Sequence, residues 1–362
     1  MSEKLCNLST GDEVYFYDNS IVICFQGKRS VLSTSLYNGG YHEDFDAIYN
    51  YDAKPKDGRP CEVSNIDYVE YMRLVSERLG LDADRVSGMA TAASMENVAI
   101  ESLSFHELTV TAIVTGGIET NGGRVGDPAD YYKPLEKPVK FGTINIMLVM
   151  DCNLDPGTLA RALVTCTEAK TAAIQELIDG SKYSTGLATG SGTDQTMLVV
   201  NAESKLILDG AGKHSKLGEL IGKTVMKAVK KALAQESGLS PRLQHNAFRR
   251  LKRYGVLAKT TWEAFHAENN TVLKPRYLVA AEKLARENAM LTYTSLYVHL
   301  LDQCAWELIS AQEMREAGQS LLDILATKYN VEKVELNGDD NDAMLTAWKL
   351  LFNHIAEHTF KA

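Results

Sequence analysis

The chain has 362 residues, of which 45% are hydrophobic and 23% are charged, and its formal net charge is −9. This composition excludes a disordered chain, a collagen-like repeat and a small disulfide scaffold, and the length suits about two domains of ~150 residues. Nucleic-acid binding relies on clustered Lys and Arg, which an acidic chain supplies poorly. We therefore expect no nucleic-acid partner.

The apolar runs and the spacing of the cysteines indicate the cellular compartment of the protein. The apolar run at 146–150 falls far short of the ~18 residues that a membrane helix requires, and the start of the chain lacks a signal-peptide pattern. The six cysteines form no CxxC pair, so their spacing favours neither a zinc site nor a disulfide framework. We expect a cytoplasmic protein with no membrane partner and no protein metal site.

The first part of the chain is predicted to be rich in strands. Strand patterns at 14–17 and 21–25 flank Asp18-Asn19-Ser20, which predicts a hairpin, and a third strand is expected at 30–36. A helix is predicted over 66–80, ending at a glycine. Strands follow at 108–115 and 142–151, with a polar, glycine-rich loop between them.

The following segment alternates helices and strands. Asp155 and Pro156 are the residue types of a helix N-cap and first turn, and apolar residues then recur at helical spacing. A second glycine-rich stretch, 186–194, precedes a strand at 196–201 and a helix at 215–235. This order predicts an α/β or mixed α+β domain with a mixed sheet and packed helices.

Beyond Leu239-Ser240-Pro241 the strand signal ends. Long helical patterns at 276–317, 319–328 and 341–358 predict an all-α C-terminal extension. We therefore place the domains at 1–238 and 239–362. The apolar periodicity of the extension suits an interaction or dimerisation module, which would make the protein a homo-oligomer, but we expect it to pack against the first domain instead.

Short motifs of common cofactor sites do not fit this sequence. The segment 218–224 has three residues between its glycines, whereas a P-loop has four, and it continues a helical pattern. Gln195 stands where a dinucleotide fingerprint beginning at Gly190 needs its third glycine. His354 and His358 have the spacing of a zinc helix but lack its catalytic glutamate. We expect no cofactor.

Small and polar residues gather instead at the ends of predicted elements, where α/β scaffolds usually carry their chemistry. Glycines let a backbone approach a ligand, while Asn, Asp, Arg and His side chains supply hydrogen bonds or proton transfer. The alternative is that these residues serve only as turns and caps. The clusters are Asn38-Gly39-Gly40-Tyr41 with Asn50, Met95-Glu96-Asn97, residues 116–127, and residues 186–194 followed by His214.

Several long motifs follow one another in the first 238 residues. They are STSLYNGGYHED (33–44), TAASMENVAI (91–100), TGGIETNGGRVGDPADYY (115–132), GTINIMLVMD (142–151), TEAKTAAIQEL (167–177), YSTGLATGSGTDQ (183–195) and GKHSKLGELIG (212–222). In this order they resemble CbiZ, the adenosylcobinamide amidohydrolase family, over about residues 10–238. The helical stretch after Ser240 lies outside the resemblance.

The resemblance implies hydrolysis of the amide that joins aminopropanol to the corrin ring of adenosylcobinamide. The product would be adenosylcobyric acid, for vitamin B12 salvage. Glycine loops and Asn side chains suit the amide fringe of a corrin, and Tyr41, Tyr131 or Tyr132 could cover its apolar surface. Because the cobalt belongs to the substrate, no cofactor is implied. The alternatives are a corrinoid-binding carrier without hydrolase activity and an amidase for another substrate.

Amide hydrolysis needs an activated water or nucleophile, donors for the oxyanion and a proton for the leaving amine. We hypothesise that His214 or Asp194 is the general base. Asn121, with the backbone amides of Gly122 and Gly123, would donate to the oxyanion. A structural role is the alternative for each of these residues.

Other residues are assigned to nucleophilic attack and substrate binding. Thr120 is an alternative hydroxyl nucleophile, and Arg124 with Asp127 would orient the substrate. The remaining candidates for substrate binding are Asn38, Gly39, Tyr41, Glu96, Asn97, Gly190, Gly192 and Thr193.

Overall fold

The computed structural model describes residues 2–54, 67–129, 142–269 and 271–361. The chain folds into two compact units. Unit 1 comprises Met1–Tyr183 and Leu187–Ser240, and unit 2 comprises Ser184–Gly186 and Pro241–Ala362. The candidate residues Tyr131 and Tyr132 lie outside the described residues.

Unit 1 contains a five-stranded sheet. In spatial order its strands are β1 (Glu3–Asn7), β2 (Glu13–Tyr17), β3 (Ser20–Cys24), β6 (Ala47–Asp52) and β7 (Val86–Thr91). The predicted hairpin is confirmed, since β2 and β3 pair antiparallel with Tyr17 opposite Ser20. Asp18 and Asn19 form its turn at φ 44° and 59°, a left-handed backbone that these two residue types tolerate.

Helix α1 (Tyr68–Arg78) connects β6 to the parallel strand β7 and packs on the outer face of this sheet. The Asp67 carboxylate caps the helix by accepting the Val69 backbone N–H at 3.0 Å. Gly80 follows the helix at φ 75°, a conformation that a glycine adopts without strain. The predicted helix and its glycine stop are confirmed.

Unit 1 also contains a second, six-stranded sheet, which packs face to face on the first. In spatial order its strands are β5 (Gly40–His42), β4 (Arg29–Ser33), β14 (Gln195–Asn201), β11 (Ile144–Met150), β9 (Leu108–Gly116) and β8 (Ala99–Phe105). The β11–β14 pair is parallel, and helix α2 (Pro156–Leu177) makes the crossover between its strands. The other neighbouring pairs are antiparallel.

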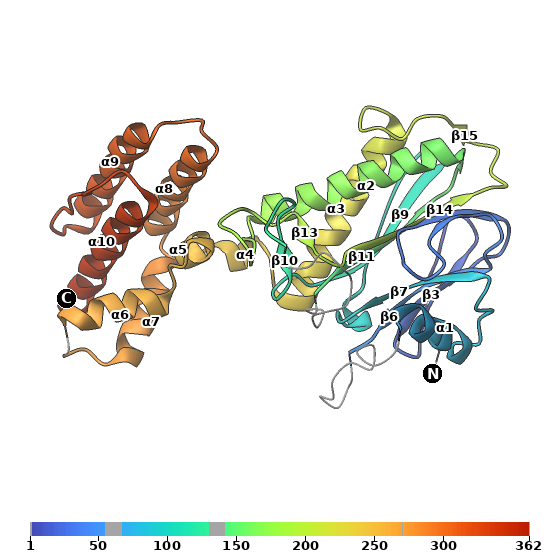
Figure 1. Ribbon diagram of the computed structural model, residues 1–362, viewed down its shortest axis with the longest axis horizontal. Helices are drawn as coiled ribbons and strands as arrows, with labels where there is room; N and C mark the ends of the chain where they lie inside the picture. Colours follow the sequence, from blue (N-terminus) through green and yellow to red (C-terminus); the bar gives the residue numbers. More distant parts are fainter. Residues whose placement is uncertain (1, 55–66, 130–141, 270, 362) are drawn as a thin grey trace. The chain divides into compact units, whose positions relative to one another are not determined.

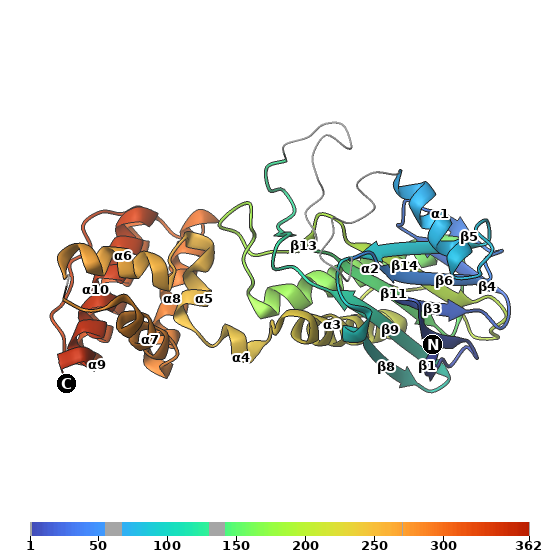
Figure 2. The same cartoon turned by 90° about the horizontal axis from the view of Figure 1, so that it is seen from below.

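Four layers result, as Figures 1 and 2 show from two directions. Helices α2 and α3 (Lys216–Ser237) cover one face of the six-stranded sheet, and the five-stranded sheet packs on the other face. In β11, Ile146 points to the helices whereas Met147 points to the other sheet. Because the strand is buried on both faces, its sequence is a continuous apolar run. The predicted mixed α/β class is confirmed, and the division into two sheets was not predicted.

Both long helices of unit 1 begin where the sequence predicts. The Asp155 carboxylate accepts the Gly157 N–H at 2.8 Å at the start of α2, and the Ser215 hydroxyl accepts the Gly218 N–H at 3.0 Å at the start of α3. Gly238, at φ 73°, ends α3. The short elements of unit 1 are η2 (Met95–Asn97), the paired strands β10 (Gly122–Gly123) and β13 (Gly190–Ser191), and the paired strands β12 (Asn153–Leu154) and β15 (Ile207–Leu208).

In its described residues, the regular elements of unit 2 are all helices, around a core that includes Tyr277, Trp348 and Phe352. None of the helices in the described part of the chain is long and apolar enough to cross a membrane. The elements are α4 (Pro241–Gln244), α5 (Ala247–Leu251), η3 (Lys252–Tyr254), α6 (Ala258–Glu268), α7 (Lys274–Ala285), α8 (Asn288–Ala305), α9 (Ala311–Tyr329) and α10 (Asn341–Lys361).

The helical pattern predicted at 276–317 is divided between α7, α8 and the start of α9. A capping box starts α9, because the Ser310 hydroxyl accepts the Glu313 N–H at 3.2 Å and the Glu313 carboxylate accepts the Ser310 N–H at 2.7 Å. The prediction of one long element was wrong because apolar periodicity continues through the breaks. The Ser-x-x-Glu spacing was the signal for the second break.

Candidate functional site

Polar residues of unit 1 meet at one edge of the six-stranded sheet. Ile144, the first residue of β11, lies opposite Gly116, the last residue of β9. Gln195 begins β14 at the same edge. The two glycine-rich loops also join there, since β10 pairs with β13 so that Gly123 lies opposite Gly190. The fold therefore brings together the clusters at 116–127 and 186–194.

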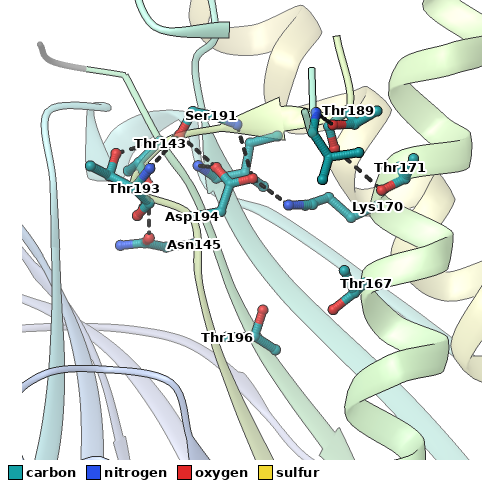
Figure 3. Close-up of polar contacts among 12 residues, drawn as sticks. Thr143, Asn145, Thr167, Lys170, Thr171, Thr189, Ser191, Thr193, Asp194 and Thr196 are labelled. Atoms are coloured by element: carbon teal, nitrogen blue, oxygen red, sulfur yellow. Dashed lines mark hydrogen bonds and ion pairs between the residues drawn. The ribbon is translucent and has the colours of Figure 1, made fainter. Parts of the chain in front are cut away.

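Asp194 is the centre of a hydrogen-bonded cluster at this edge (Figure 3). Its Oδ1 accepts the Ile144 backbone N–H at 2.8 Å and the Ser191 hydroxyl at 2.7 Å. Its Oδ2 accepts the Ser191 backbone N–H at 3.0 Å and forms an ion pair with Lys170. The Asp194 side chain is 10% exposed. Bonds to a charged acceptor in such a buried place are strong and fix the orientation of the carboxylate.

Lys170 and Ser191 were not among the residues predicted from the sequence. Lys170 lies on α2 between Cys166 and Ala173, which are one turn away and buried, and its own side chain is 12% exposed. A lysine in the buried stripe of a helix requires a partner, so the helical periodicity held a signal for it. Ser191 lies within a predicted glycine loop, and nothing in the sequence distinguished its hydroxyl from those of its neighbours.

Gly190 leaves the space that the ion pair occupies. A Cβ atom at this position would lie 2.3 Å from Asp194 Oδ2 and 2.7 Å from Lys170 Nζ. Any larger residue at 190 must therefore displace at least one of the two charged groups. The predicted glycine candidate is thus placed against the cluster by a close approach of the backbone.

Asn121 and Thr193 form a second group beside Asp194. The Asn121 amide donates to the Gly142 carbonyl oxygen at 3.0 Å, and the Thr193 hydroxyl donates to the same oxygen at 2.9 Å. The Asn121 carbonyl oxygen accepts the Tyr183 hydroxyl at 2.9 Å. A Cβ atom on Gly192 would lie 4.0 Å from the Asn121 amide. The predicted residues Asn121, Gly192 and Thr193 are therefore neighbours.

Arg124 and Asp127 tie the two glycine loops to each other. The Asp127 carboxylate accepts the Arg124 backbone N–H at 2.7 Å and the Ser181 hydroxyl at 2.5 Å. The Arg124 guanidinium donates to the Leu187 carbonyl oxygen at 3.3 Å. These bonds hold the loop that begins at Gly122 against the loop that leads to Asp194.

The Gly122 backbone N–H is used within its own turn, because it donates to the Ile118 carbonyl oxygen at 2.9 Å. This bond disagrees with the prediction that the Gly122 amide donates to an oxyanion. Thr120 is exposed and lies at the same edge, since a Cβ atom on Gly142 would be 3.3 Å from its hydroxyl oxygen.

His214 is not brought to this edge. It is exposed and directly precedes Ser215, the N-cap of α3. Glu236, near the other end of the same helix, lies beside the edge, since a Cβ atom on Gly117 would be 3.3 Å from its Cγ. The Glu236 carboxylate also accepts the Asn97 amide at 2.8 Å, which places Asn97 near the edge. Its neighbour Glu96 is exposed on η2.

The remaining candidates hold other parts of the fold. The Asn38 amide donates to the Ala83 and Val86 carbonyl oxygens at 2.8 and 2.7 Å, and a Cβ atom on Gly39 would lie 2.0 Å from the Ser35 carbonyl oxygen. Tyr41 lines a surface pocket with Asn153 and Ala202. Those two residues follow the C-terminal ends of β11 and β14, whereas Asp194 precedes the start of β14. Tyr41 is therefore at the opposite edge of the sheet.

Burial raises the pKa of two residues near the cluster. Burial raises the pKa of the Cys166 thiol to about 12, so this residue of α2 carries no thiolate at neutral pH. Burial also raises the pKa of Tyr68, whose hydroxyl accepts the Gln195 amide at 3.3 Å. Across the described residues, no group of three or more His, Cys, Asp and Glu side chains could hold a metal ion.

The fold and this cluster define an α/β protein with a buried ion pair beside two glycine-rich loops. The family model described as CbiZ, adenosylcobinamide amidohydrolase, matches residues 5–241, so the chain belongs to this family. The predicted resemblance is confirmed.

Two proteins, one known by its sequence and one by its crystal structure, are similar to this chain. The chain is 34% identical over 230 residues to the uncharacterized protein MJ1613 of Methanocaldococcus jannaschii, a match that covers 60% of this chain and 86% of that protein. The crystal structure of the PH0078 protein from Pyrococcus horikoshii is 13% identical, with a TM-score of 0.30, over 66% of this chain and 86% of that one.

Proposed function

We propose that the protein hydrolyses the amide bond between aminopropanol and the corrin ring of adenosylcobinamide, and so releases adenosylcobyric acid for corrinoid salvage. Membership of the adenosylcobinamide amidohydrolase family supports this reaction. The substrate brings its own cobalt, so the proposed reaction needs no cofactor. We place the reaction in the cytoplasm.

The observation that carries the proposal is the carboxylate of Asp194, held beside Lys170 at an edge that both glycine-rich loops reach. Amide hydrolysis needs acid–base groups and donors for a developing negative charge, and a largely buried lysine and carboxylate supply both. Of the two bases that we hypothesised, Asp194 is favoured over His214, because His214 lies at the far end of α3.

The loops that surround the ion pair suit an amide-fringed ring. Gly192 and Thr120 are exposed at this edge, and Gly123 and Arg124 are partly exposed. Backbone groups of glycines and the guanidinium of an arginine can pair with amide oxygens, which a corrin carries around its rim. We therefore assign this edge, rather than the Tyr41 pocket, to substrate binding.

The decisive experiment incubates the purified full chain with adenosylcobinamide, without added metal or nucleotide, and measures adenosylcobyric acid and free aminopropanol by mass spectrometry. Stoichiometric release of both products is expected. The matched pair of variants is Asp194→Asn, which should lower turnover by ~10²-fold or more, and Asp209→Asn, on the loop that precedes α3, which should not. A tight complex that yields no product would contradict hydrolysis and would favour the carrier. If cobinamide neither binds nor inhibits, the substrate is another amide.

A further inference from the structure

Within this cluster, the Ser191 hydroxyl is hydrogen-bonded to a carboxylate. Its Oγ donates to Asp194 Oδ1 at 2.7 Å and accepts the Thr193 backbone N–H at 3.2 Å (Figure 3). Ser191 is only partly buried, and the next residue, Gly192, is exposed. The hydroxyl oxygen is thus oriented from two sides, in a residue that is only partly buried.

The neighbouring threonine hydroxyls are bound differently. Thr193 donates to the Gly142 carbonyl oxygen at 2.9 Å, and Thr143 donates to the Thr193 carbonyl oxygen at 2.6 Å. A backbone carbonyl is too weak a base to take a proton from a hydroxyl during attack, whereas a carboxylate can do so. Among these three hydroxyls, Ser191 alone has a base as its acceptor.

Asp194 has no acceptor site left for a water molecule. A carboxylate has about four lone-pair directions. Two are filled at Oδ1 by the Ile144 N–H and the Ser191 hydroxyl, and two at Oδ2 by the Ser191 N–H and Lys170. The proton that Asp194 can receive from a nucleophile is therefore the hydroxyl proton of Ser191, and direct activation of water would require one of these bonds to break.

Lys170 supplies a positive charge next to the same carboxylate. Its ammonium group has three N–H donors, and its partner within the described residues is Asp194. The side chain is 12% exposed, and the missing Cβ of Gly190 leaves room for its Nζ next to the Asp194 carboxylate. A cation in such a place can stabilise a developing oxyanion and can protonate a leaving group.

We propose that Ser191 is a covalent nucleophile, with Asp194 and Lys170 as its proton relay, an inference that rests on the proposed amide hydrolysis. Ser191 Oγ bonds to the amide carbon while its proton passes to Asp194 Oδ1. The C–N bond then breaks as Lys170 gives a proton to the departing nitrogen, and Asp194 returns a proton to Lys170. Aminopropanol leaves as the amine, and the corrin carboxyl group remains as an ester of Ser191.

The second half of the reaction regenerates the enzyme. Formation of the ester removes the hydroxyl proton of Ser191, so one acceptor site on Asp194 Oδ1 becomes free. Once aminopropanol has left, water attacks the ester carbon and gives one proton to Asp194 at this site. That proton returns to Ser191 Oγ as the ester C–O bond breaks, so that the sum of both halves is amide plus water giving carboxylic acid plus amine. No oxidant, metal or nucleotide enters this balance.

The experiment measures turnover of adenosylcobinamide by Ser191→Ala and Ser104→Ala, and traps the ester by adding hydroxylamine to the wild-type reaction. Ser104 is an exposed serine of β8, hydrogen-bonded to Thr109, and serves as the matched control. We expect Ser191→Ala to lose roughly 10³-fold or more and Ser104→Ala to be unchanged. The wild type should form the hydroxamate of the corrin carboxyl group in proportion to the hydroxylamine. Ser191→Ala turnover within tenfold of wild type, or acid as the sole product at high hydroxylamine, would overturn the proposal.

Two further measurements keep the test decisive. If Ser191→Ala fails to fold, Ser191→Cys retains a nucleophile, and alkylation of the new thiol should abolish the activity that remains; activity that survives alkylation contradicts a nucleophile at 191. If the wild type does not hydrolyse adenosylcobinamide at all, the proposed function fails separately. A fluorophosphonate, which labels activated serines, then tests Ser191 separately. Labelling would identify Ser191 as an activated nucleophile for another amide, whereas an unlabelled Ser191 would overturn this inference as well.

The role of Lys170 as the acid has its own readout. Lys170→Met should slow hydrolysis of the amide far more than hydrolysis of a nitrophenyl ester of the same corrin carboxyl group, because a nitrophenolate leaves without protonation. If Lys170 only held the fold together, both substrates would slow by the same factor.

Discussion

The Asn145 side-chain amide donates a hydrogen bond of 2.8 Å to the side-chain carbonyl oxygen of Asn50. Asn145 belongs to β11 of the six-stranded sheet and Asn50 to β6 of the five-stranded sheet, so this bond joins the two sheets inside the protein. Both residues are at most 2% exposed. The Asn50 amide continues the network to the Thr115 hydroxyl at 2.8 Å. The chain thus fixes the facing sheets with polar bonds next to the edge that carries the candidate site.

Asn145→Ala should therefore destabilise the fold. The substitution leaves the Asn50 carbonyl oxygen buried without its donor, which costs about 1–3 kcal/mol of unfolding free energy. Urea denaturation of the full chain, followed by circular dichroism, measures this loss. The control is Asn7→Ala, an exposed position on β1, for which a change within ~0.5 kcal/mol is expected. Equal effects of the two variants would argue against a structural role for the bond.

Gly190→Ala should lower both the activity and the stability of the protein. The added methyl group must displace Asp194 Oδ2 or Lys170 Nζ, and these are the ends of side chains that can shift at modest cost. We expect a loss of ~1–3 kcal/mol in unfolding free energy and at least a tenfold loss in turnover. Thermal denaturation and product release are measured on the same preparation.

Gly222→Ala is the matched control for that prediction. Gly222 is inside α3, and a Cβ atom there meets nothing within 4 Å. An alanine in a helix interior is more favourable than a glycine by up to ~1 kcal/mol, so stability should rise slightly and turnover should stay the same. A Gly190→Ala variant as active as Gly222→Ala would show that the ion pair tolerates displacement.

Local signals in the sequence predicted most elements of unit 1. The Asp155 cap, the Asp18–Asn19 turn and the glycine after α1 each depend on residues adjacent in the chain, so their patterns could be interpreted without knowledge of the fold. The pairing of strands into two sheets depends on contacts between distant residues, and buried strands such as β11 lack the alternation that would assign a face.

The candidate site was predicted only in part, because some of its contacts likewise join residues that are distant in the sequence. The two glycine loops were identifiable by composition, and the fold places Asp194, Asn121 and Thr193 together where those loops meet. Lys170 comes from a helix, and only the tertiary packing of α2 brings it to Asp194. His214 follows a polar motif in the sequence, yet the length of α3 separates it from the cluster.

The ion pairs of Glu101 predict a pH dependence of stability. Burial by itself would raise the pKa of this carboxyl group, but its bonds to Lys227 at 2.7 Å and Lys231 at 2.9 Å outweigh burial and lower the pKa below 4.5. A carboxyl group whose pKa is lowered by folding stabilises the protein above its unfolded pKa, and this contribution is lost as the pH falls through the folded value.

Glu101→Gln measures that contribution. Because both lysines are about half exposed or more, the two pairs together are worth about 1 kcal/mol at neutral pH. The difference in unfolding free energy between wild type and Glu101→Gln should be largest near pH 7 and should narrow as the pH falls below about 4.5. Glu107→Gln, an exposed residue of the β8–β9 turn, should show no such pH-dependent difference. A constant difference from pH 7 to pH 3 for Glu101→Gln would contradict the assignment.

Cys152 and Cys166 should resist alkylation in the folded protein. Both thiols are fully buried, and burial raises the pKa of each to about 12, so the thiolate that reacts with iodoacetamide is almost absent at pH 8. Peptide mass spectrometry after alkylation in buffer and in urea should show these two cysteines labelled only in urea. Cys304 is partly exposed and should be labelled faster in buffer. Native labelling of Cys166 at the rate of the unfolded chain would mean that α2 opens on the timescale of the reaction, and the Lys170–Asp194 pair, which depends on the same helix, would then be only transiently formed.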